Sequence, residues 1–333
     1  MELKKSGPDT SLRIRRMKRL LVIKPSSLGD IVHALQVVQT FAQERPEWRI
    51  SWVVRERFAG LVHAAAFVDE VIIFRRRDGW TPFFGLLREL RRQEYDAVWD
   101  MQGLLRSGLM TAVARSPEKW GRRDAREGAG WFCNRRVELP PGAGPHHALD
   151  ILQQYLRSVG VTPRLEFPLQ LHASLAYPWQ GFFRGEPRNT FLLFTDSRGA
   201  EKKWPHFNEL TARIFAAVPE CRVAWCAGRH KDPEVDLPKE RFLNLTGCSM
   251  EQMIALVRQP TTFVGNDSGP MHLAAALGHR VLAIFGPSSP RRFGPYPLDA
   301  AKHRFVAAPE GRLDKLEPAT VLAALLELRS RVL

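Results

Sequence analysis

The alternation of short apolar runs with longer helical segments constrains the fold of this chain more than any other feature. The runs are rich in Val, Ile and Phe, and most end in a turn that leads into a segment with helical periodicity. Strands that alternate with helices of this length form parallel sheets whose crossover helices cover both faces. We predict strands over the ranges 20–24, 50–54, 71–74, 96–102, 190–195, 222–228, 242–246, 261–267 and 281–286.

The pattern occurs twice, which predicts two doubly wound α/β domains with a cleft between them. It weakens between residues 116 and 187 and restarts at 190. A chain of 333 residues also exceeds what one hydrophobic core usually serves. We therefore divide the chain into a basic tail (1–17), an N-terminal domain (18–180), a C-terminal domain (181–312) and a terminal helix (313–333).

Two turns at predicted strand ends have the composition of ligand-binding turns: PSSLGD (25–30) and GNDSGPMH (265–272). Ligands of such sheets bind outside the carboxyl ends of the strands. A helix N-terminus with small residues offers free N–H groups to a phosphate. Lys202 or Lys203, in the loop after strand 190–195, could reach a phosphate held there. Simple helix capping and solvated lysines are the alternative interpretation.

Asp30 stands where the first of these turns enters a helix. It is either a general base or an ordinary first-turn carboxylate that favours the helix dipole. Either way the helix N-terminus should lower its pKa. The chain has neither GxGxxG after a strand nor GxxxxGK[ST], which disfavours a standard dehydrogenase and a P-loop NTPase. No cluster has metal-ligand spacing, and the adjacent His146 and His147 lie in a turn-rich segment.

The charge balance predicts a polyanionic partner. The chain has 49 Lys and Arg against 35 Asp and Glu, a formal charge of +14. Nucleic acid, an anionic membrane surface or a phosphorylated substrate would each fit, and so would a charge that only keeps the protein soluble. The four cysteines show no pairing pattern, and no apolar stretch is long enough to span a membrane. We expect a cytoplasmic protein that could lie at the inner face of the cell membrane.

Four blocks in this order resemble the ADP-heptose:lipopolysaccharide heptosyltransferases, glycosyltransferase family 9: KPSSLGDIVHAL (24–35), YDAVWDMQGLLRS (95–107), KKWP (202–205) and GNDSGPMHLAAALG (265–278). DMQGLLRS with WFCNRR (131–136) is more similar to heptosyltransferase I than to heptosyltransferase II. The resemblance implies a GT-B fold, two tandem Rossmann-like domains facing across a cleft. It also implies inverting, metal-independent transfer of a heptose from ADP-heptose to the Kdo of Kdo-lipid A. The ADP-sugar is then a substrate, and no cofactor is expected.

By position, the resemblance makes Asp30 the catalytic base. It places the donor on Thr195, Lys202, Asp267, Ser268, Gly269 and His272. For the anionic acceptor we expect Ser27, Gly29, Gln102, Arg106, Arg55, Arg57 and Arg136, with Arg106 as the leading candidate. The aromatic group 80–84 could rest on a lipid surface or belong to the core. One departure is the pair Arg229 and His230, where the family often has a glutamate near the donor's ribose.

Three rival functions remain open on the sequence. The nearest is a related GT-B transferase with another nucleotide sugar or acceptor. A basic nucleic-acid-binding protein would show a basic face interleaved with aromatics, but the basic residues are dispersed and no such motif occurs. A non-catalytic ADP-sugar sensor would need no carboxylate at position 30. We expect an anionic lipid A precursor as partner, with no nucleic acid and no stable protein partner.

Overall fold

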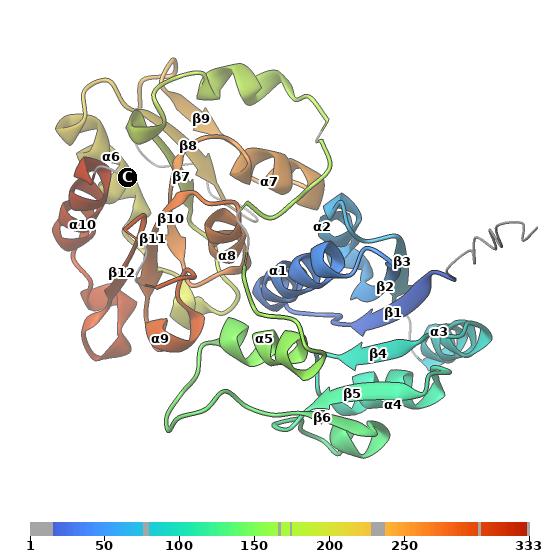
Figure 1. Cartoon of the computed structure of the whole chain (residues 1–333). Helices are drawn as coiled ribbons and strands as arrows, with labels where there is room; N and C mark the ends of the chain where they lie inside the picture. The colour runs from blue at the N-terminus through green and yellow to red at the C-terminus, as the bar shows by residue number, and fades with distance from the viewer. Residues whose placement is uncertain are drawn as a thin grey trace, which may run out of the picture.

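The computed structural model describes residues 16–75, 80–165, 168–173, 175–227, 237–298 and 301–331. Within these ranges the chain forms two parallel sheets of six strands, each flanked by helices (Figure 1). The predicted α/β class is therefore confirmed. The predictions for residues 1–15, and for Arg229 and His230, concern residues outside the described ranges.

The N-terminal sheet has the strand order β3-β2-β1-β4-β5-β6. Its strands are β1 (Lys18–Ile23), β2 (Trp48–Arg55), β3 (Glu70–Phe74), β4 (Ala97–Asp100), β5 (Glu118–Arg122) and β6 (Arg135–Val137). The helices of this half are α1 (Leu28–Glu44), α2 (Ala59–Ala64), α3 (Trp80–Arg92), α4 (Leu105–Val113) and α5 (Ala148–Ser158), with the 3₁₀-helix η2 (Ala129–Phe132) between β5 and β6.

The C-terminal sheet has the order β12-β11-β10-β7-β8-β9. Its strands are β7 (Thr190–Phe194), β8 (Arg222–Cys226), β9 (Phe242–Asn244), β10 (Thr262–Asn266), β11 (Arg280–Phe285) and β12 (His303–Ala307). Its helices are α6 (Phe207–Ala217), α7 (Met250–Val257), α8 (Gly269–Ala276), α9 (Pro290–Phe293) and α10 (Pro318–Ser330).

In each sheet the strand order reverses beside the strand that leads into a predicted ligand turn. The reversal lies between β1 and β4 in the first sheet and between β10 and β7 in the second. Crossover helices leave such a point on opposite faces, which opens a crevice at the carboxyl ends of the two central strands. This topology places the turn after β1 and the turn after β10 at the two crevices.

The period of two along β1 divides the core of the N-terminal domain between its two faces. Leu21 and Ile23 pack into a cluster with α3 and α4, whereas Leu20 and Val22 pack toward α1. The stretch of α1 from Ile31 to Phe41 is buried throughout, because the helix lies between its own sheet, α5 and α8. The cluster around α1 continues into α7 and α8. Apolar packing therefore joins the two domains at α1 and α8.

All nine predicted strands are present, but the structure adds β5, β6 and β12, which the apolar pattern does not predict. β5 reads EKWGR and β6 reads RRV, so neither contains an apolar run. Each is placed by its neighbour in the sheet, because β5 pairs with β4 and β6 pairs with β5. Tertiary pairing therefore outweighs local composition in this region.

Two further predictions concern α3 and α10. In the aromatic group 80–84, Phe83 is buried in the core whereas Phe84 is 57% exposed. The predicted terminal helix is present as α10, and it packs on α6, β11 and β12. Its buried residues Val321, Leu325 and Leu328 belong to the core of the C-terminal domain.

Candidate active site at the domain junction

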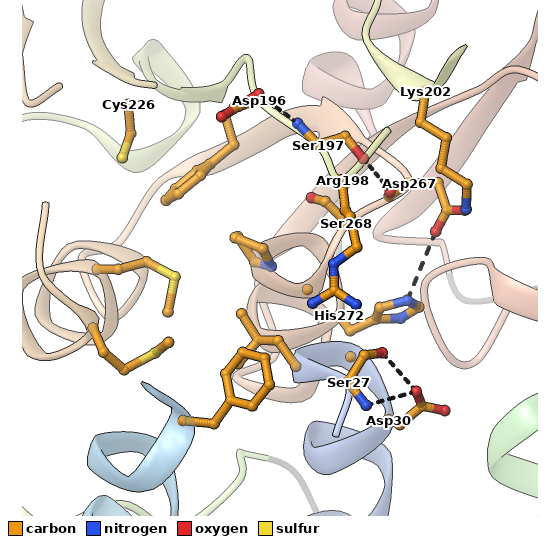
Figure 2. A pocket seen from close by; sticks show the side chains of 18 of the residues that line it. Ser27, Asp30, Asp196, Ser197, Arg198, Lys202, Cys226, Asp267, Ser268 and His272 are labelled. Carbon is orange, nitrogen blue, oxygen red and sulfur yellow. Dashed lines mark hydrogen bonds and ion pairs between the residues drawn. The ribbon is translucent and has the colours of Figure 1, made fainter. Parts of the chain in front are cut away.

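A cavity of about 650 Å³ lies between the two domains at the carboxyl ends of both sheets (Figure 2). Its walls come from the N-termini of α1 and α8, the loops after β7 and β8, and the start of α7. Eight predicted site residues line it: Ser27, Gly29, Asp30, Lys202, Asp267, Ser268, Gly269 and His272. The fold therefore brings the two predicted turns together at one cavity.

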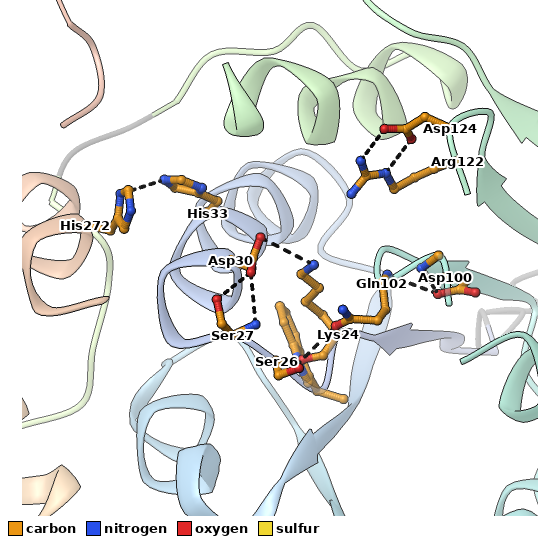
Figure 3. A network of polar contacts seen from close by, with 12 residues as sticks. Lys24, Ser26, Ser27, Asp30, His33, Asp100, Gln102, Arg122, Asp124 and His272 are labelled. Carbon is orange, nitrogen blue, oxygen red and sulfur yellow. Dashed lines mark hydrogen bonds and ion pairs between the residues drawn. The ribbon is translucent and has the colours of Figure 1, made fainter. Parts of the chain in front are cut away.

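Asp30 is held by one of its carboxylate oxygens and keeps the other accessible (Figure 3). Its Oδ2 accepts hydrogen bonds from the backbone N–H of Ser27 at 3.0 Å and from the Ser27 hydroxyl at 2.6 Å. Its Oδ1 lies 3.8 Å from the Nζ of Lys24, and the side chain is 42% exposed. The carboxylate is thus oriented by the turn while one oxygen can still meet a ligand.

The electrostatics of Asp30 favour its ionised form. Burial alone would raise the pKa of the carboxyl, but the Lys24 ammonium and the Ser27 hydrogen bonds hold that pKa well below its usual range. The predicted direction is confirmed. To the helix dipole that the sequence predicts as the cause, the structure adds a buried lysine, Lys24. The pKa of Lys24 is itself lowered, because burial disfavours its charge.

Arg122 adds a second basic group to the polar network around Asp30, behind the residues that line the cavity (Figure 3). Its guanidinium forms a two-point ion pair with Asp124, at 2.8 Å from Nε and 2.6 Å from Nη2. It also interacts electrostatically with Asp30 and Lys24. The carboxylate of Asp30 is therefore set in a basic surrounding, which suits an acceptor that carries its own negative charge.

On the opposite wall, Lys202 and Asp267 form an ion pair. The Nζ of Lys202 lies 2.6 Å from Oδ2 of Asp267, and the Ser288 hydroxyl donates to the same oxygen at 2.6 Å. Asp267 is 8% exposed, whereas Lys202 is 31% exposed. The buried carboxylate thus positions a lysine that is itself partly accessible.

His272 links this ion pair to the N-terminal domain. Its Nε2 lies 4.0 Å from Oδ1 of Asp267, and its Nδ1 lies 3.1 Å from Nε2 of His33 in α1. Burial lowers the pKa of His272 to about 4, because Asp267 offsets only part of the desolvation. Burial also holds the pKa of His33 well below its usual range. Both rings are therefore neutral near pH 7, and one ring must donate the shared hydrogen bond.

The N-terminus of α8 is the part of the cavity suited to an anion. Ser268 precedes the helix, and within the described part of the chain its buried hydroxyl has no hydrogen-bond partner. Gly269 comes next, and a Cβ there would lie 2.5 Å from the Leu28 side chain of α1. The backbone N–H groups of the first helical turn and the Ser268 hydroxyl are hydrogen-bond donors that could bind a phosphate.

Residues 83–317 match the profile of glycosyltransferase family 9 (heptosyltransferase). The chain belongs to glycosyltransferase family 9. The family predicted from the four sequence blocks is therefore confirmed, and this chain is a glycosyltransferase.

Curated relatives of this family 9 transferase are lipopolysaccharide heptosyltransferases. The lipopolysaccharide core heptosyltransferase OpsX of Haemophilus influenzae is 27% identical over 84% of this chain and 82% of its own length. Lipopolysaccharide heptosyltransferase 1 of Pseudomonas aeruginosa is 30% identical over 84% and 81%. Lipopolysaccharide heptosyltransferase 1 of Escherichia coli strain K12 is 29% identical over 93% and 100%.

A solved structure of the Escherichia coli heptosyltransferase WaaC with ADP has a TM-score of 0.73 to this transferase at 25% identity. The alignment covers 93% of this chain and 99% of that one. E. coli ADP-heptose heptosyltransferase II shares the fold with a TM-score of 0.72. The expected GT-B arrangement of two Rossmann-like domains is confirmed.

The family 9 transferase presents different residues than expected after β7. Thr195 does not line the cavity; its backbone N–H donates to the Cys226 carbonyl and its carbonyl accepts from the Asn266 amide. Asp196, Ser197 and Arg198 line the wall instead. The Ser197 hydroxyl contacts the turn after β10, because its Oγ donates to the backbone carbonyl of Asp267 at 3.0 Å.

The predicted acceptor residues divide in two groups. Ser27 and Gly29 line the cavity, whereas the remaining ones lie outside its wall: Gln102, Arg106, Arg55, Arg57 and Arg136. Gln102 still acts on the site, because its Oε1 accepts from the backbone N–H of Ser26 at 3.3 Å and so braces the turn before Asp30. Arg106 and Arg136 are exposed, and the Arg57 guanidinium packs over the Phe58 ring.

In the part of the chain that the structure describes, no group of three or more His, Cys, Asp and Glu side chains is placed to hold a metal ion. Over the same residues, no helix has the length and apolar character needed to cross a membrane.

Proposed function

We propose that this enzyme transfers a heptose from ADP-heptose to the Kdo of an inner-core lipopolysaccharide precursor, with inversion at the anomeric carbon and without a metal. The observation that carries the proposal is the placement of Asp30 and of the Lys202–Asp267 pair on opposite walls of one cavity. The names of the curated relatives support the sugar and the acceptor, and the ADP in the WaaC structure supports the nucleotide.

In the proposed reaction, Asp30 removes the proton from the acceptor hydroxyl. The oxygen then attacks the anomeric carbon as the bond to the diphosphate breaks, and the electron pair of that bond leaves with ADP. One displacement from the face opposite the leaving group inverts the configuration. Among the carboxylates on the cavity wall, Asp196 and Asp267 form ion pairs with lysines at 2.5 and 2.6 Å. Asp30, at 3.8 Å from its lysine, is the best placed to act as base.

The leaving diphosphate would bind at the N-terminus of α8. Lys202, the backbone N–H groups and the Ser268 hydroxyl would stabilise the negative charge that develops on it. On the acceptor side, Lys24 and Arg122 surround Asp30 with positive charge and would attract the Kdo carboxylate. Kdo-lipid A is anchored in a membrane, so we propose that the enzyme acts at the cytoplasmic membrane surface.

A donor screen tests the proposal. Purified protein is incubated with Kdo-lipid A and, separately, with ADP-, UDP- and GDP-sugars, and the products are identified by mass spectrometry. We expect the mass of one heptose to be added with ADP-heptose alone, also in the presence of a metal chelator. The Asp30→Asn variant should bind ADP but form no product. Transfer from a UDP- or GDP-sugar, or from no ADP-sugar, would overturn the assignment of the substrate.

A further inference from the structure

Three large apolar side chains are exposed on the side of the N-terminal domain that carries α3 and α4. Phe84 in the first turns of α3 is 57% exposed, Leu105 at the start of α4 is 44% exposed, and Trp131 in η2 is 86% exposed. α3 contacts α4, and α4 contacts η2. Figure 1 shows α3 and α4 away from the junction with the C-terminal domain. We call the surface that carries Phe84, Leu105 and Trp131 the outer face.

The turn that carries Trp131 is built into the domain. Glu127 accepts a hydrogen bond from the backbone N–H of Leu105 at 3.1 Å, and the N–H of Arg126 donates to the Gly103 carbonyl at 2.9 Å. These bonds tie η2 to the start of α4, so Leu105 and Trp131 belong to one local structure. A tryptophan that is held in place and exposed has an apolar ring and a polar N–H to offer, the combination that suits a membrane interface.

The surroundings of these side chains are basic. Segment 121–136 contains five arginines and two acidic residues, and α3 contains three arginines and one glutamate. Arg122 and Arg123 form ion pairs with Asp124 and Glu138. Arg126 and Arg135 are exposed, and in the described ranges they form no ion pair. Exposed apolar groups among unneutralised arginines are complementary to an anionic lipid surface.

The outer face lies on the same side of the N-terminal domain as the acceptor end of the cavity. Crossover helices begin at the carboxyl ends of the strands. The starts of α3 and α4 therefore lie at the same end of the sheet as the start of α1, which carries Asp30. The loop after β5 runs to η2 from Arg122, which interacts electrostatically with Asp30. A membrane along the outer face would therefore lie next to the acceptor side of the cavity.

We propose that the outer face docks on a bilayer that contains anionic phospholipid. The inference rests on the proposed function, because it supplies the surface on which a lipid-anchored acceptor would be met. A second copy of this chain is a poorer occupant, since a symmetric contact would set like-charged arginines against one another.

Vesicle flotation tests the docking directly. The full chain is mixed with vesicles of phosphatidylcholine with or without phosphatidylglycerol, in the absence of lipopolysaccharide and nucleotide sugar. We expect binding to the anionic vesicles only. The double variant Phe84→Ser, Trp131→Ser and the charge variant Arg126→Glu, Arg135→Glu should each bind at least tenfold more weakly. Phe305→Ser is the matched control, because Phe305 is 42% exposed on β12 of the other domain, and it should bind like the parent chain.

Two more measurements separate this inference from the proposed function. Turnover of a soluble, deacylated acceptor should be equal for all variants, because the outer face is outside the cavity. Absence of any heptose transfer would refute the function and leave the vesicle result valid. Unchanged vesicle binding by the charge variant, or light scattering that shows the double variant losing a dimer instead of vesicle binding, would overturn the docking proposal.

Discussion

Lys202 and Asp267 form a 2.6 Å ion pair whose two members differ in exposure: the carboxylate is 8% exposed and the lysine 31%. The same carboxylate oxygen accepts from Ser288, and the backbone carbonyl of Asp267 accepts from Ser197. Asp267 is therefore fixed by two loops, and it positions the lysine above the N-terminus of α8.

The first prediction concerns this lysine. Lys202→Met should lower kcat by about 10²- to 10³-fold, because a preorganised charge at the leaving group is typically worth about 3 to 4 kcal/mol of barrier. The protein should still fold, but its melting temperature should fall, because the buried carboxylate of Asp267 loses its cationic partner. Steady-state kinetics and thermal unfolding measure the two effects. Lys203→Met is the control: Lys203 pairs with Asp196 instead and should retain most of the activity.

The second prediction uses the buried lysine beside the base. In the parent enzyme the pKa of Asp30 lies below its ordinary range, so Asp30 should cause no loss of kcat/KM on the acid side between pH 5 and 8. Lys24→Met removes the positive charge that lowers this pKa, so the pKa rises and the acid limb moves to higher pH. Lys18→Met, at the exposed start of the same strand, should leave the profile unchanged. An identical profile for both variants would show that Lys24 does not tune Asp30.

The sequence predicts those parts of the site whose cause is local. Asp30 and Asp267 each follow a strand and stand at a helix N-terminus, and both features are visible in a few consecutive residues. Lys24 lies in the same short stretch, but its role depends on its side chain turning back into the domain to meet Asp30. A lysine at a strand end is normally solvated, so the sequence gives no reason to expect a buried one.

The remaining groups come together through the topology of the sheets. Arg122 reaches the neighbourhood of Asp30 because β5 lies beside β4, and β5 itself lacks an apolar run. His33 and His272 are 239 residues apart in sequence and meet because α1 packs on α8. Pairing between domains has no signature in a single sequence, since each histidine taken alone is typical of a buried helix position.

The third prediction follows from the neutral histidine at the junction. The pKa of His272 falls from 6.5 to about 4 on folding, chiefly through burial and despite Asp267. Between pH 6.5 and pH 4, His272 binds a proton in the unfolded chain but stays neutral in the folded chain. The free energy of unfolding should therefore fall by about 3 kcal/mol between pH 6.5 and pH 4 from this group. Above pH 6.5 His272 is neutral in both states, so it no longer makes the free energy of unfolding depend on pH.

Urea denaturation of the parent chain and of His272→Gln at several pH values measures this effect. The variant should have a shallower loss of stability with falling pH, by about that amount. His279 and His303 have similarly lowered pKa values and remain unchanged in both proteins, so they cancel in the comparison. His33 contacts His272 directly, and the difference between the two curves therefore measures the titration of the His33–His272 pair. Parallel curves would contradict the assignment.

The fourth prediction concerns the close approach of α1 and α8. A Cβ on Gly29 would lie 2.4 Å from the His272 ring, so neither helix can keep its place if alanine is introduced. Gly29→Ala should destabilise the protein by about 1 to 3 kcal/mol, as expected of overpacking in a tight core. It should also weaken ADP binding, because the N-terminus of α8 must move away from α1.

Gly85→Ala is the matched control for this change. Gly85 lies in α3, and a Cβ there would meet nothing within 4 Å. Alanine is the better helix former, so this variant should be more stable by about 0.5 to 1 kcal/mol. Calorimetry of both variants, together with ADP titrations, tests the contrast. If Gly29→Ala retained the stability and ADP affinity of the parent chain, the contact between α1 and α8 would not control the geometry of the cavity.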